Sequence, residues 1–274
     1  MASPEIPTAA SGRSALDVAR ALAEEAGRRA RARFRQPQEV TVKGRGNLLT
    51  ETDLEIERFI QQALAEEFPD HNVLSEETAA GTSTDGYVWV VDPLDGTKNF
   101  VSGIPIWCVN IALCLDGEPL VAATHDPNHN ETFSAQRGAG AELGGHPIRA
   151  SSKSTVLESL LGIDIGYDDK RGRRLLHLAL KLFPGMQALR IPGSAALGLA
   201  YAACGRYDLF LHRHLYPWDI AAGILLVQEA GGAITDHRGA PIAVASQSAI
   251  AGSARAHADF LGWQEAHAGD LELD

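Results

Sequence analysis

The sequence predicts an α+β fold made of two layered halves, and two observations lead to this prediction. In the first half, two helical segments precede a run of short strands joined by tight turns, which is typical of an antiparallel meander. In the second half, helical segments alternate with short strands, as in a layered α/β arrangement. We place the first half at residues 14–152 and the second at residues 153–267.

The first half is predicted to open with two helices. Apolar residues recur with a helical period from Ser14 to Phe34 and again from Asp53 to Phe68. The preceding residues 1–13 are rich in Pro, Ser, Ala and Thr, and we expect them to be disordered, as we expect of the short acidic tail 269–274.

Strands follow these helices in quick succession. The β-branched and aromatic residues of Tyr87–Val91 predict a buried strand. The meander follows, with strands at Cys108–Leu115, Pro119–Thr124 and Glu131–Ala135 and a hairpin turn at Asp116–Gly117.

The pattern changes past about residue 150. Helices are expected at Arg171–Phe183, Ser194–Gly205, Pro217–Gly231 and Ala254–Ala266. Short strands are expected at Ala188–Ile191, Asp208–Leu211, Ala233–Thr235 and Ala249–Ala251. The basic residues at 171–174 are interpreted as a solvated helix start.

Composition and charge limit the classes of function. With 274 residues, 45% of them hydrophobic, the chain can form a sizeable core. Its net charge of −11 argues against a nucleic-acid polymer as partner. No signal peptide or membrane span is indicated, so no membrane partner is expected. Cys108, Cys114 and Cys204 are odd in number and lack CxxC spacing, which favours reduced thiols and a cytoplasmic location.

The most informative motif begins where the predicted strand before residue 92 ends. Asp92 and Asp95 stand three residues apart, and Pro93 disfavours helical dihedrals at Asp92. Gly96 permits a tight turn, and Thr97 can cap a short helix whose first amides are free to bind an anion. Hard oxygen ligands beside such a turn are the chemistry of Mg²⁺-assisted phosphoryl transfer. An Asx-turn with a solvated acid is the alternative for such a pair taken alone.

Three further acidic sites occur where an element of structure begins or ends. Thr50 and Asp53 open a helical pattern, which a simple helix N-cap would also explain. Glu76 and Glu77 follow a short apolar strand, although paired acids in a loop are usually solvated. Asp219 opens a helix that is apolar nearly all round, where the dipole favours an acid but burial demands a partner. The shared position of these acids, where an element begins or ends, favours a metal-binding role over solvated acids.

These motifs resemble those of the inositol monophosphatase family of Mg²⁺-dependent, lithium-sensitive phosphatases. The signature stretches are Trp89–Phe100 and Pro217–Gly223, the second followed by Glu229–Gly232. The similarity extends in the expected order from about Leu16 to about Leu261. The resemblance implies the layered αβαβα sugar-phosphatase fold, with the catalytic site between the two halves.

The resemblance also implies the ligands of two or three Mg²⁺ ions. Glu76, Asp92 and the backbone carbonyl of Leu94 would hold the first ion. Asp92, Asp95 and Asp219 would hold the second, so that Asp92 bridges the pair. A third, weaker ion would lie near Glu76.

The implied reaction is hydrolysis of a small phosphorylated polyol or sugar, such as inositol 1-phosphate, by direct attack of a metal-bound water. Glu76 and Thr97 would orient the water, and Asp53 would polarise Thr97 from behind. The amides of Gly96 and Thr97 would cradle the phosphate. The enzyme would be a phosphoric monoester hydrolase without a covalent phosphoenzyme.

The substrate side of the site is also implied by the resemblance. The residues implied to bind the substrate are Lys43, Asp95, Gly96, Thr97, Gly193, Ser194, Ala195, His212 and Asp219. Residues 43–47 are interpreted as a mobile, substrate-facing loop. His212 departs from the pattern, because inositol-specific members place a glutamate there. A histidine with an ordinary pKa near 6.5 would be protonated near pH 6, and we expect it to broaden the specificity towards substrates with a second phosphate.

Several alternatives stay open. The candidate substrates are inositol monophosphates, fructose 1,6-bisphosphate, histidinol phosphate and 3′-phosphoadenosine nucleotides, in that order. A catalytically silent relative that binds or regulates is the non-enzymatic alternative, although clustered acids that repel one another argue against it. A zinc site is not predicted, because the histidines contain no HExxH pair and we expect His212 and His214 to face apart. A homodimer is implied by the family alone.

Overall fold

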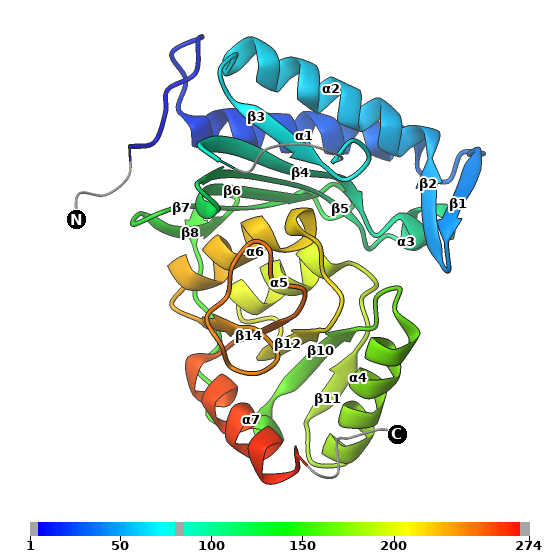
Figure 1. The fold of residues 1–274 in the computed structure, drawn as a ribbon, viewed down its shortest axis with the longest axis vertical. Coiled ribbons are helices and arrows are strands. Elements are labelled where there is room, and N and C mark those ends of the chain that lie inside the picture. The colour runs from blue at the N-terminus through cyan, green and yellow to red at the C-terminus, as the bar shows by residue number, and fades with distance from the viewer. Residues whose placement is uncertain (1–4, 80–84, 269–274) are drawn as a thin grey trace.

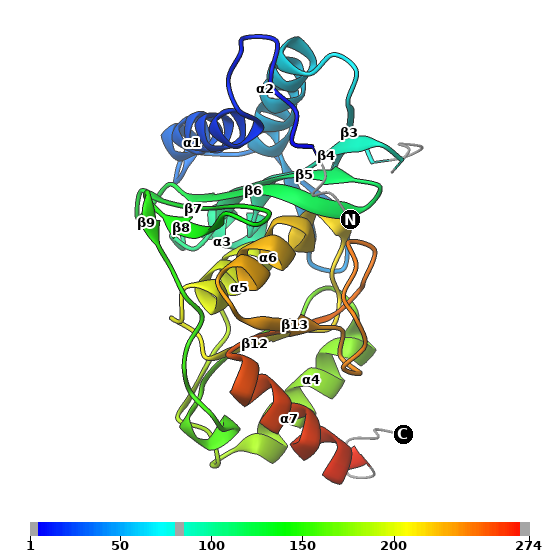
Figure 2. The same cartoon turned by 90° about the vertical axis from the view of Figure 1, so that its left-hand side faces the viewer.

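Three layers of helices and two sheets alternate through the molecule. The computed structural model describes residues 5–79 and 85–268. Figure 1 shows helices α1 and α2 above one sheet, helices α5 and α6 between the two sheets, and helices α4 and α7 below the other. Figure 2 shows the same stacking after a quarter turn. The predicted layered α+β fold is therefore confirmed, whereas its division at residues 152 and 153 stays a prediction.

The outer layer of the first half consists of α1 (Ala15–Arg33) and α2 (Glu51–Glu67). The hydroxyl of Ser14 caps α1 by accepting a hydrogen bond of 3.0 Å from the amide of Asp17. Small alanines on the buried face of α1 let it lie close to the first sheet. Between the helices, β1 (Val40–Gly44) and β2 (Asn47–Thr50) form an antiparallel hairpin. The expected loop at residues 43–47 is therefore the turn of a hairpin.

The first sheet has seven strands among the described residues, in the order β3-β4-β5-β6-β7-β8-β9. Its strands are β3 (Asn72–Ser75), β4 (Tyr87–Asp95), β5 (Cys108–Leu115), β6 (Glu118–Asp126), β7 (Glu131–Gln136), β8 (Gly140–Leu143) and β9 (His146–Pro147). Only β3 and β4 pair in parallel among these, and the remaining pairs are antiparallel. The predicted meander is confirmed, and the short helix α3 (Thr97–Val101) follows β4.

The second sheet has five strands in the described chain, in the order β11-β10-β12-β14-β13. Its strands are β10 (Leu160–Asp164), β11 (Ala188–Arg190), β12 (Leu209–His212), β13 (Ala233–Thr235) and β14 (Ala249–Gly252). The helices of this half are a 3₁₀ turn η1 (Val156–Glu158), α4 (Asp169–Leu182), α5 (Ala195–Ala203), α6 (Pro217–Glu229) and α7 (Ala254–Ala266). Strand β10 pairs in parallel with both neighbours and was not predicted.

The segment before α1 corrects one expectation. Residues 5–13 are not disordered, because Ala9 is only 5% exposed and the amide of Ala10 donates a 2.8 Å hydrogen bond to the carbonyl of Glu67. The hydroxyl of Tyr87 also donates to the carbonyl of Glu5. Residues 1–4 and the predicted acidic tail 269–274 lie outside the described residues.

Two further observations concern the chain as a whole. Cys108, Cys114 and Cys204 are all free thiols. No helix in the described part of the chain has the length and apolar character needed to cross a bilayer.

Candidate functional site

Three aspartates converge between the first sheet and α6. One carboxylate oxygen from each of Asp92, Asp95 and Asp219 lies within 4.8 Å of the others. Residues three apart on a regular strand face opposite sides of a sheet. The pairing of β4 with β5 is irregular between Asp92 and Asp95, and this local bulge allows both side chains to reach one site. The predicted juxtaposition of these three carboxylates is what the structure shows.

Asp219 is held by contacts at the start of α6. The side-chain amide of Asn110, on β5, donates a 2.7 Å hydrogen bond to the carbonyl of Trp218. Thr124 on the neighbouring strand β6 donates to the carbonyl oxygen of the Asn110 side chain at 2.6 Å. The amide of Tyr216 donates to Asp219 itself at 2.7 Å. These bonds fix the first turn of α6 against the first sheet.

Asp95 is held by the start of α5. It accepts hydrogen bonds from the amide of Ala196 at 2.9 Å, from the amide of Ala195 at 3.3 Å and from the hydroxyl of Ser194. Ser194 is only 1% exposed and lies behind Asp95. The hydroxyl of Ser194 therefore orients a carboxylate, and its predicted contact with a substrate stays a prediction.

Glu76 lies beside the aspartates but is paired with a lysine. The ammonium nitrogen of Lys43 lies 3.6 Å from Glu76 and 2.6 Å from Glu77. The amide of Glu77 donates to Glu57 on α2 at 3.0 Å, which fixes the loop that carries both glutamates. Lys43, predicted as a substrate contact, thus has two carboxylate partners. Burial lowers its pKa, but the glutamates outweigh this and raise it overall.

Asp53 and Thr97 meet behind the aspartates. The hydroxyl of Thr97 lies within hydrogen-bond distance of Asp53, at 3.2 Å, and of the carbonyl of Leu94, at 3.1 Å. Asp53 also accepts from the amide of Thr50 at 2.8 Å, so the N-cap interpretation of this pair is correct as well. The prediction that Thr97 caps α3 is wrong. The cap residue is Gly96, in the left-handed conformation at φ 95°.

Gly96 is confined by the backbone of two other segments. A Cβ atom at this position would lie 3.0 Å from the carbonyl oxygen of Ile106 and 3.3 Å from that of Gly193. The side chain of Asn99 donates to the carbonyls of Ile106 and Pro192 and so holds these segments together. The turn before α3 therefore requires glycine both for its dihedral angle and for space.

The electrostatics of this cluster favour a bound cation. Burial, followed by the charges of neighbouring carboxylates, raises the pKa of Asp92 and Asp219 well above the ordinary value. Burial also raises the pKa of Asp95, although its hydrogen bonds oppose this, and burial together with Glu77 raises that of Glu76 to about 8. Every donor is an oxygen, and oxygen ligands suit hard divalent ions. The residues present therefore fit an ion such as Mg²⁺.

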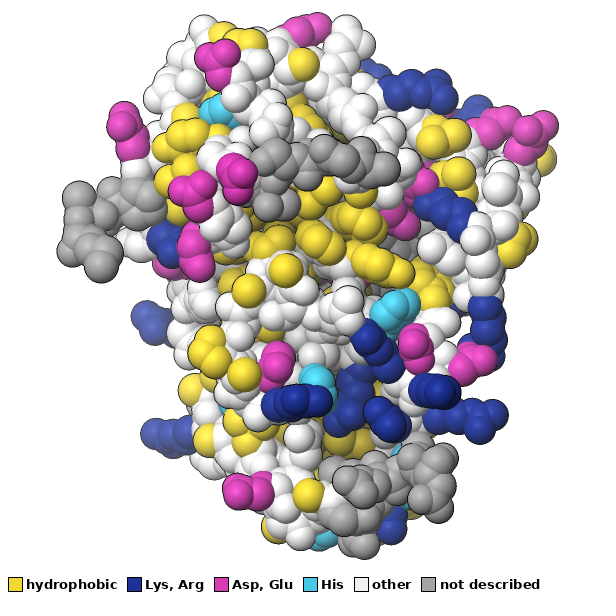
Figure 3. Space-filling model, viewed as in Figure 1, with side chains coloured by type: hydrophobic (Ala, Val, Ile, Leu, Met, Phe, Trp, Pro, Cys, Tyr) yellow, Lys and Arg dark blue, Asp and Glu magenta, His cyan; other side chains and the backbone are white. Residues whose placement is uncertain are grey.

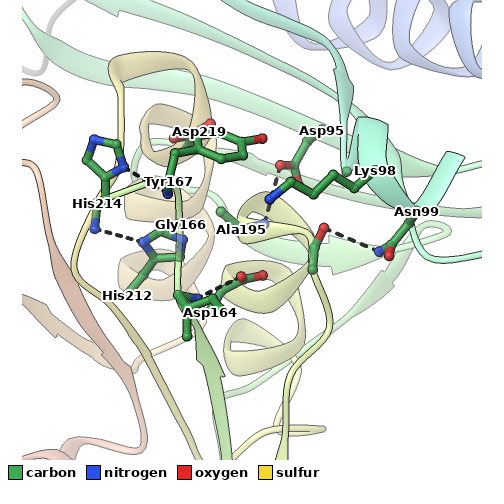
Figure 4. A pocket seen from close by; sticks show the side chains of 13 residues that line it. Asp95, Lys98, Asn99, Asp164, Gly166, Tyr167, Ala195, His212, His214 and Asp219 are labelled. Carbon is green, nitrogen blue, oxygen red and sulfur yellow. Dashed lines mark hydrogen bonds between the residues drawn. The ribbon is translucent and has the colours of Figure 1, made fainter. Parts of the chain in front are cut away.

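A pocket opens next to the aspartates, and Figure 4 shows its labelled side chains. It is lined by Asp95, Gly96, Lys98, Asn99, Asp164, Ile165, Gly166, Tyr167, Gly193, Ala195, His212, His214 and Asp219. Of the predicted substrate contacts, the lining includes Asp95, Gly96, Gly193, Ala195, His212 and Asp219, whereas Lys43, Thr97 and Ser194 are not part of it. Lys98 extends into the pocket with its ammonium nitrogen 4.5 Å from the ring centre of Tyr167.

His212 corrects two expectations. Burial lowers its pKa to about 3, so it stays neutral near pH 6 and the expected protonation there is wrong. Its Nδ1 atom accepts a hydrogen bond of 3.0 Å from the amide of His214, which leaves the proton on Nε2. The expectation that His212 and His214 face apart is also wrong, because residues two apart along a strand share a face, and both histidines line the same pocket.

Comparison with known proteins agrees with this geometry. The model of the inositol monophosphatase family matches residues 13–268. The chain belongs to the inositol monophosphatase family. Inositol monophosphatase 1 of Solanum lycopersicum is 40% identical over 86% of this chain and 89% of its own length. The Nus factor SuhB of Escherichia coli K12 is 36% identical over 88% of this chain and 91% of its own length.

Solved structures of inositol monophosphatases share the fold. An IMPase from Thermotoga maritima superposes with a TM-score of 0.83 at 31% identity, covering 94% of this chain and 99% of that one. The staphylococcal SaIMPase-II has been solved with inositol monophosphate bound and with 2′AMP bound, at TM-scores of 0.78 and 0.79 and 28% identity. Each comparison covers 93% of this chain and 95% of the staphylococcal one.

In this member of the inositol monophosphatase family, several site residues were not predicted from the sequence. Asn99 lies within a signature stretch, so its motif could have indicated it. Asp164 and Tyr167 lie in the pocket, and burial followed by the charge of Asp95 raises the pKa of Asp164 to about 6. Asn110 belongs to an apolar strand, where a single polar residue was the available signal.

Proposed function

We propose that this chain is a Mg²⁺-dependent phosphomonoesterase that hydrolyses a small phosphorylated polyol or sugar, with inositol 1-phosphate as the first candidate. The observation that carries the proposal is the convergence of Asp92, Asp95 and Asp219 beside a polar pocket. The family membership supports the same reaction class.

Two or three Mg²⁺ ions would be held by the carboxylates of Glu76, Asp92, Asp95 and Asp219 together with the carbonyl of Leu94. Such ions supply positive charge that activates a water and stabilises the attacking and leaving oxygens of a phosphoryl transfer. Lys43 lies 3.6 Å from Glu76, and its positive charge opposes the rise in the pKa of that carboxyl group.

Thr97 and Asp53 would orient the attacking water. The Thr97 hydroxyl faces two acceptors, Asp53 and Leu94, and therefore gives its proton to one of them. Its lone pairs remain free to accept a hydrogen bond from the water. Glu76, raised in pKa by burial and by Glu77, would accept a hydrogen bond from the same water. The first amides of α3, at Gly96 and Thr97, would bind the phosphate.

The pocket lining favours a substrate rich in hydroxyl groups. Asp95 and Asp164 offer acceptors for hydroxyl hydrogens, whereas His212 and Lys98 offer donors. The hydroxyl groups of inositol monophosphates can donate to these acceptors and accept from these donors, and the same molecules carry the phosphate. Fructose 1,6-bisphosphate, histidinol phosphate and 3′-phosphoadenosine nucleotides are the remaining candidates. The bound inositol monophosphate of SaIMPase-II supports placing inositol monophosphates first.

The deciding experiment is phosphate release from a panel of these phosphomonoesters with Mg²⁺ present. We expect turnover of inositol 1-phosphate that requires Mg²⁺ and is absent in Asp219→Asn. If every substrate fails while calorimetry shows Mg²⁺ binding, the chain is instead the catalytically silent binding relative.

We also propose a homodimer in a reducing compartment such as the cytoplasm. Leu176, Leu180 and Phe183 form an exposed apolar stripe along α4, and the last two are each 68% exposed. Leu180→Asp should then shift the protein from dimer to monomer in sedimentation velocity. Burial raises the pKa of Cys114 to about 12, and such unreactive free thiols fit a reducing compartment.

A further inference from the structure

A second pocket, apart from the carboxylate site, is lined mainly by arginines. Its lining residues are Arg171, Arg174, Arg213, His237, Arg238, Gln247 and Ser248, around a cavity of about 230 Å³. Figure 3 shows Lys and Arg side chains gathered on this face, between α4 and the loop that follows β13. The chain as a whole carries a net charge of −11, so this local concentration of positive charge runs against its composition.

The charge of this pocket is left largely uncompensated. The half-buried guanidinium of Arg213 has no hydrogen bond or ion pair with any described group, and burial together with the charge of Arg174 lowers its pKa. The carboxylate of Asp168 lies 4.0 Å from Arg171, at the limit of an ion pair. Asp236 accepts hydrogen bonds from amides of its own loop, at Arg238 and Ala240. A desolvated cation beside a like charge is stabilised by a bound anion.

Arg171 and His237 are also held in place before any ligand arrives. Arg171 donates 2.7 Å and 3.3 Å hydrogen bonds to the side chain of Gln247 and to the carbonyl of Arg213. The ring of His237 is hydrogen-bonded to the hydroxyl of Ser248 at 2.9 Å. Burial, followed by the charge of Arg213, lowers the pKa of His237, so the positive charge of the pocket comes from its arginines.

We propose that this arginine pocket binds a small phosphate-type anion. Guanidinium groups bind phosphate oxygens through paired, charge-assisted hydrogen bonds. The arginines line one compact, open pocket instead of forming an extended stripe, which favours a small ligand over a polymer. Arg213 stands between His212 and His214, so the occupied site adjoins the backbone of two residues in the first pocket's lining.

The test uses the full-length protein stripped of metal on a chelating resin, because soluble chelators are themselves anions. Without metal, the carboxylate cluster has no cation with which to bind an anion, which leaves the arginine pocket as the site under test. Titration calorimetry with pyrophosphate should show one saturable site that weakens as NaCl is added. Arg213→Gln and Arg174→Gln should each lower the affinity by roughly tenfold or more. The matched control Arg255→Gln, an exposed arginine on α7, should leave the affinity unchanged.

Further measurements make the outcome decisive. Arg213→Gln should unfold at no lower temperature than the unchanged protein, and if it misfolds, the exposed Arg238→Gln takes its place. Tighter binding of ribose 5-phosphate than of inorganic phosphate would assign the pocket to organic phosphates, and the reverse order would assign it to free phosphate. Equal pyrophosphate affinity in both pocket variants, no binding, or binding of single-stranded RNA that pyrophosphate does not displace would overturn the proposal.

Discussion

The side-chain amide of Asn110 donates a hydrogen bond of 2.7 Å to the carbonyl of Trp218, and this bond joins β5 of the first sheet to the first turn of α6. Asn110 also pairs with Asp92 across β4 and β5. One residue thus neighbours an acid in the chain's first half and holds the helix turn that presents Asp219. The relative position of these two carboxylates depends on it.

Replacing Asn110 with alanine should therefore impair the metal site more than the fold. The carbonyl of Trp218 and the hydroxyl of Thr124 would each lose a buried partner, at a cost of about 1–3 kcal/mol in the free energy of unfolding. Mg²⁺ affinity, measured by calorimetry, should fall, whereas the exposed Asn72→Ala should change neither quantity. Unchanged Mg²⁺ affinity in Asn110→Ala would show that α6 keeps its place without this bond.

Asp92→Asn and Asp219→Asn should abolish turnover and yet raise the thermal stability of the metal-free protein. Each change removes one charge from a buried cluster whose members raise one another's pKa. Phosphate release and thermal unfolding should be followed on the same samples, with and without Mg²⁺. Near-normal turnover in both variants would contradict the assigned ligands.

The metal-free protein should become more stable as the pH falls from about 8 towards 5. The pKa of Glu76 is raised from 4.5 to about 8 in the folded state, so between these values the native state binds more protons than the unfolded state. The raised pKa values of Asp92, Asp95 and Asp219 act in the same direction. Denaturant unfolding at a series of pH values would measure the slope.

Saturating Mg²⁺ should flatten or reverse that slope, because the ions bind the deprotonated carboxylates. If the free energy of unfolding of the metal-free protein rose with pH, the pKa values of these acids would not be raised in the folded state.

His212→Glu should shift the specificity towards inositol 1-phosphate. The neutral histidine presents a donor at Nε2, whereas a glutamate presents acceptors for substrate hydroxyls. We expect the ratio of kcat/KM for inositol 1-phosphate over fructose 1,6-bisphosphate to rise about tenfold, the equivalent of one hydrogen bond to a charged group. In the unchanged protein, His212 should stay neutral between pH 6 and 7.5, because its pKa is about 3. Its protonation should therefore not change this ratio in that range. An unchanged ratio in the variant would show that His212 does not contact the substrate.

Lithium at millimolar concentration should inhibit phosphate release. The oxygens of Asp92, Asp95 and Asp219 form a compact anionic site in which a small hard cation can compete with Mg²⁺. Equal concentrations of KCl serve as the control for ionic strength. Absence of inhibition at every ratio of Li⁺ to Mg²⁺ would set this site apart from the family's.

The sequence could predict features that depend on neighbouring residues. The cap of α2 at Thr50 and the meander that begins with β5 follow local patterns, and the structure has both. The grouping of the aspartates came from the family resemblance, since no local pattern relates Asp92 to Asp219.

Long-range contacts account for what sequence reasoning missed. The hydroxyl of Ser194 bonds to Asp95, and Lys43 pairs with Glu77, and neither partner could be identified from the local motif. Residues 5–13 have the composition of a disordered segment, yet Ala9 is buried near the end of α2.

Asp95 and Ser194 are separated by 99 positions, and the last acid of the cluster, Asp219, comes later still. A ribosome therefore completes the first sheet well before it supplies the partners that orient Asp95. Until then the growing chain has carboxylates but no finished ion site. Recovery of Mg²⁺ binding during refolding would thus time the docking of α5 and α6, independently of when either sheet forms.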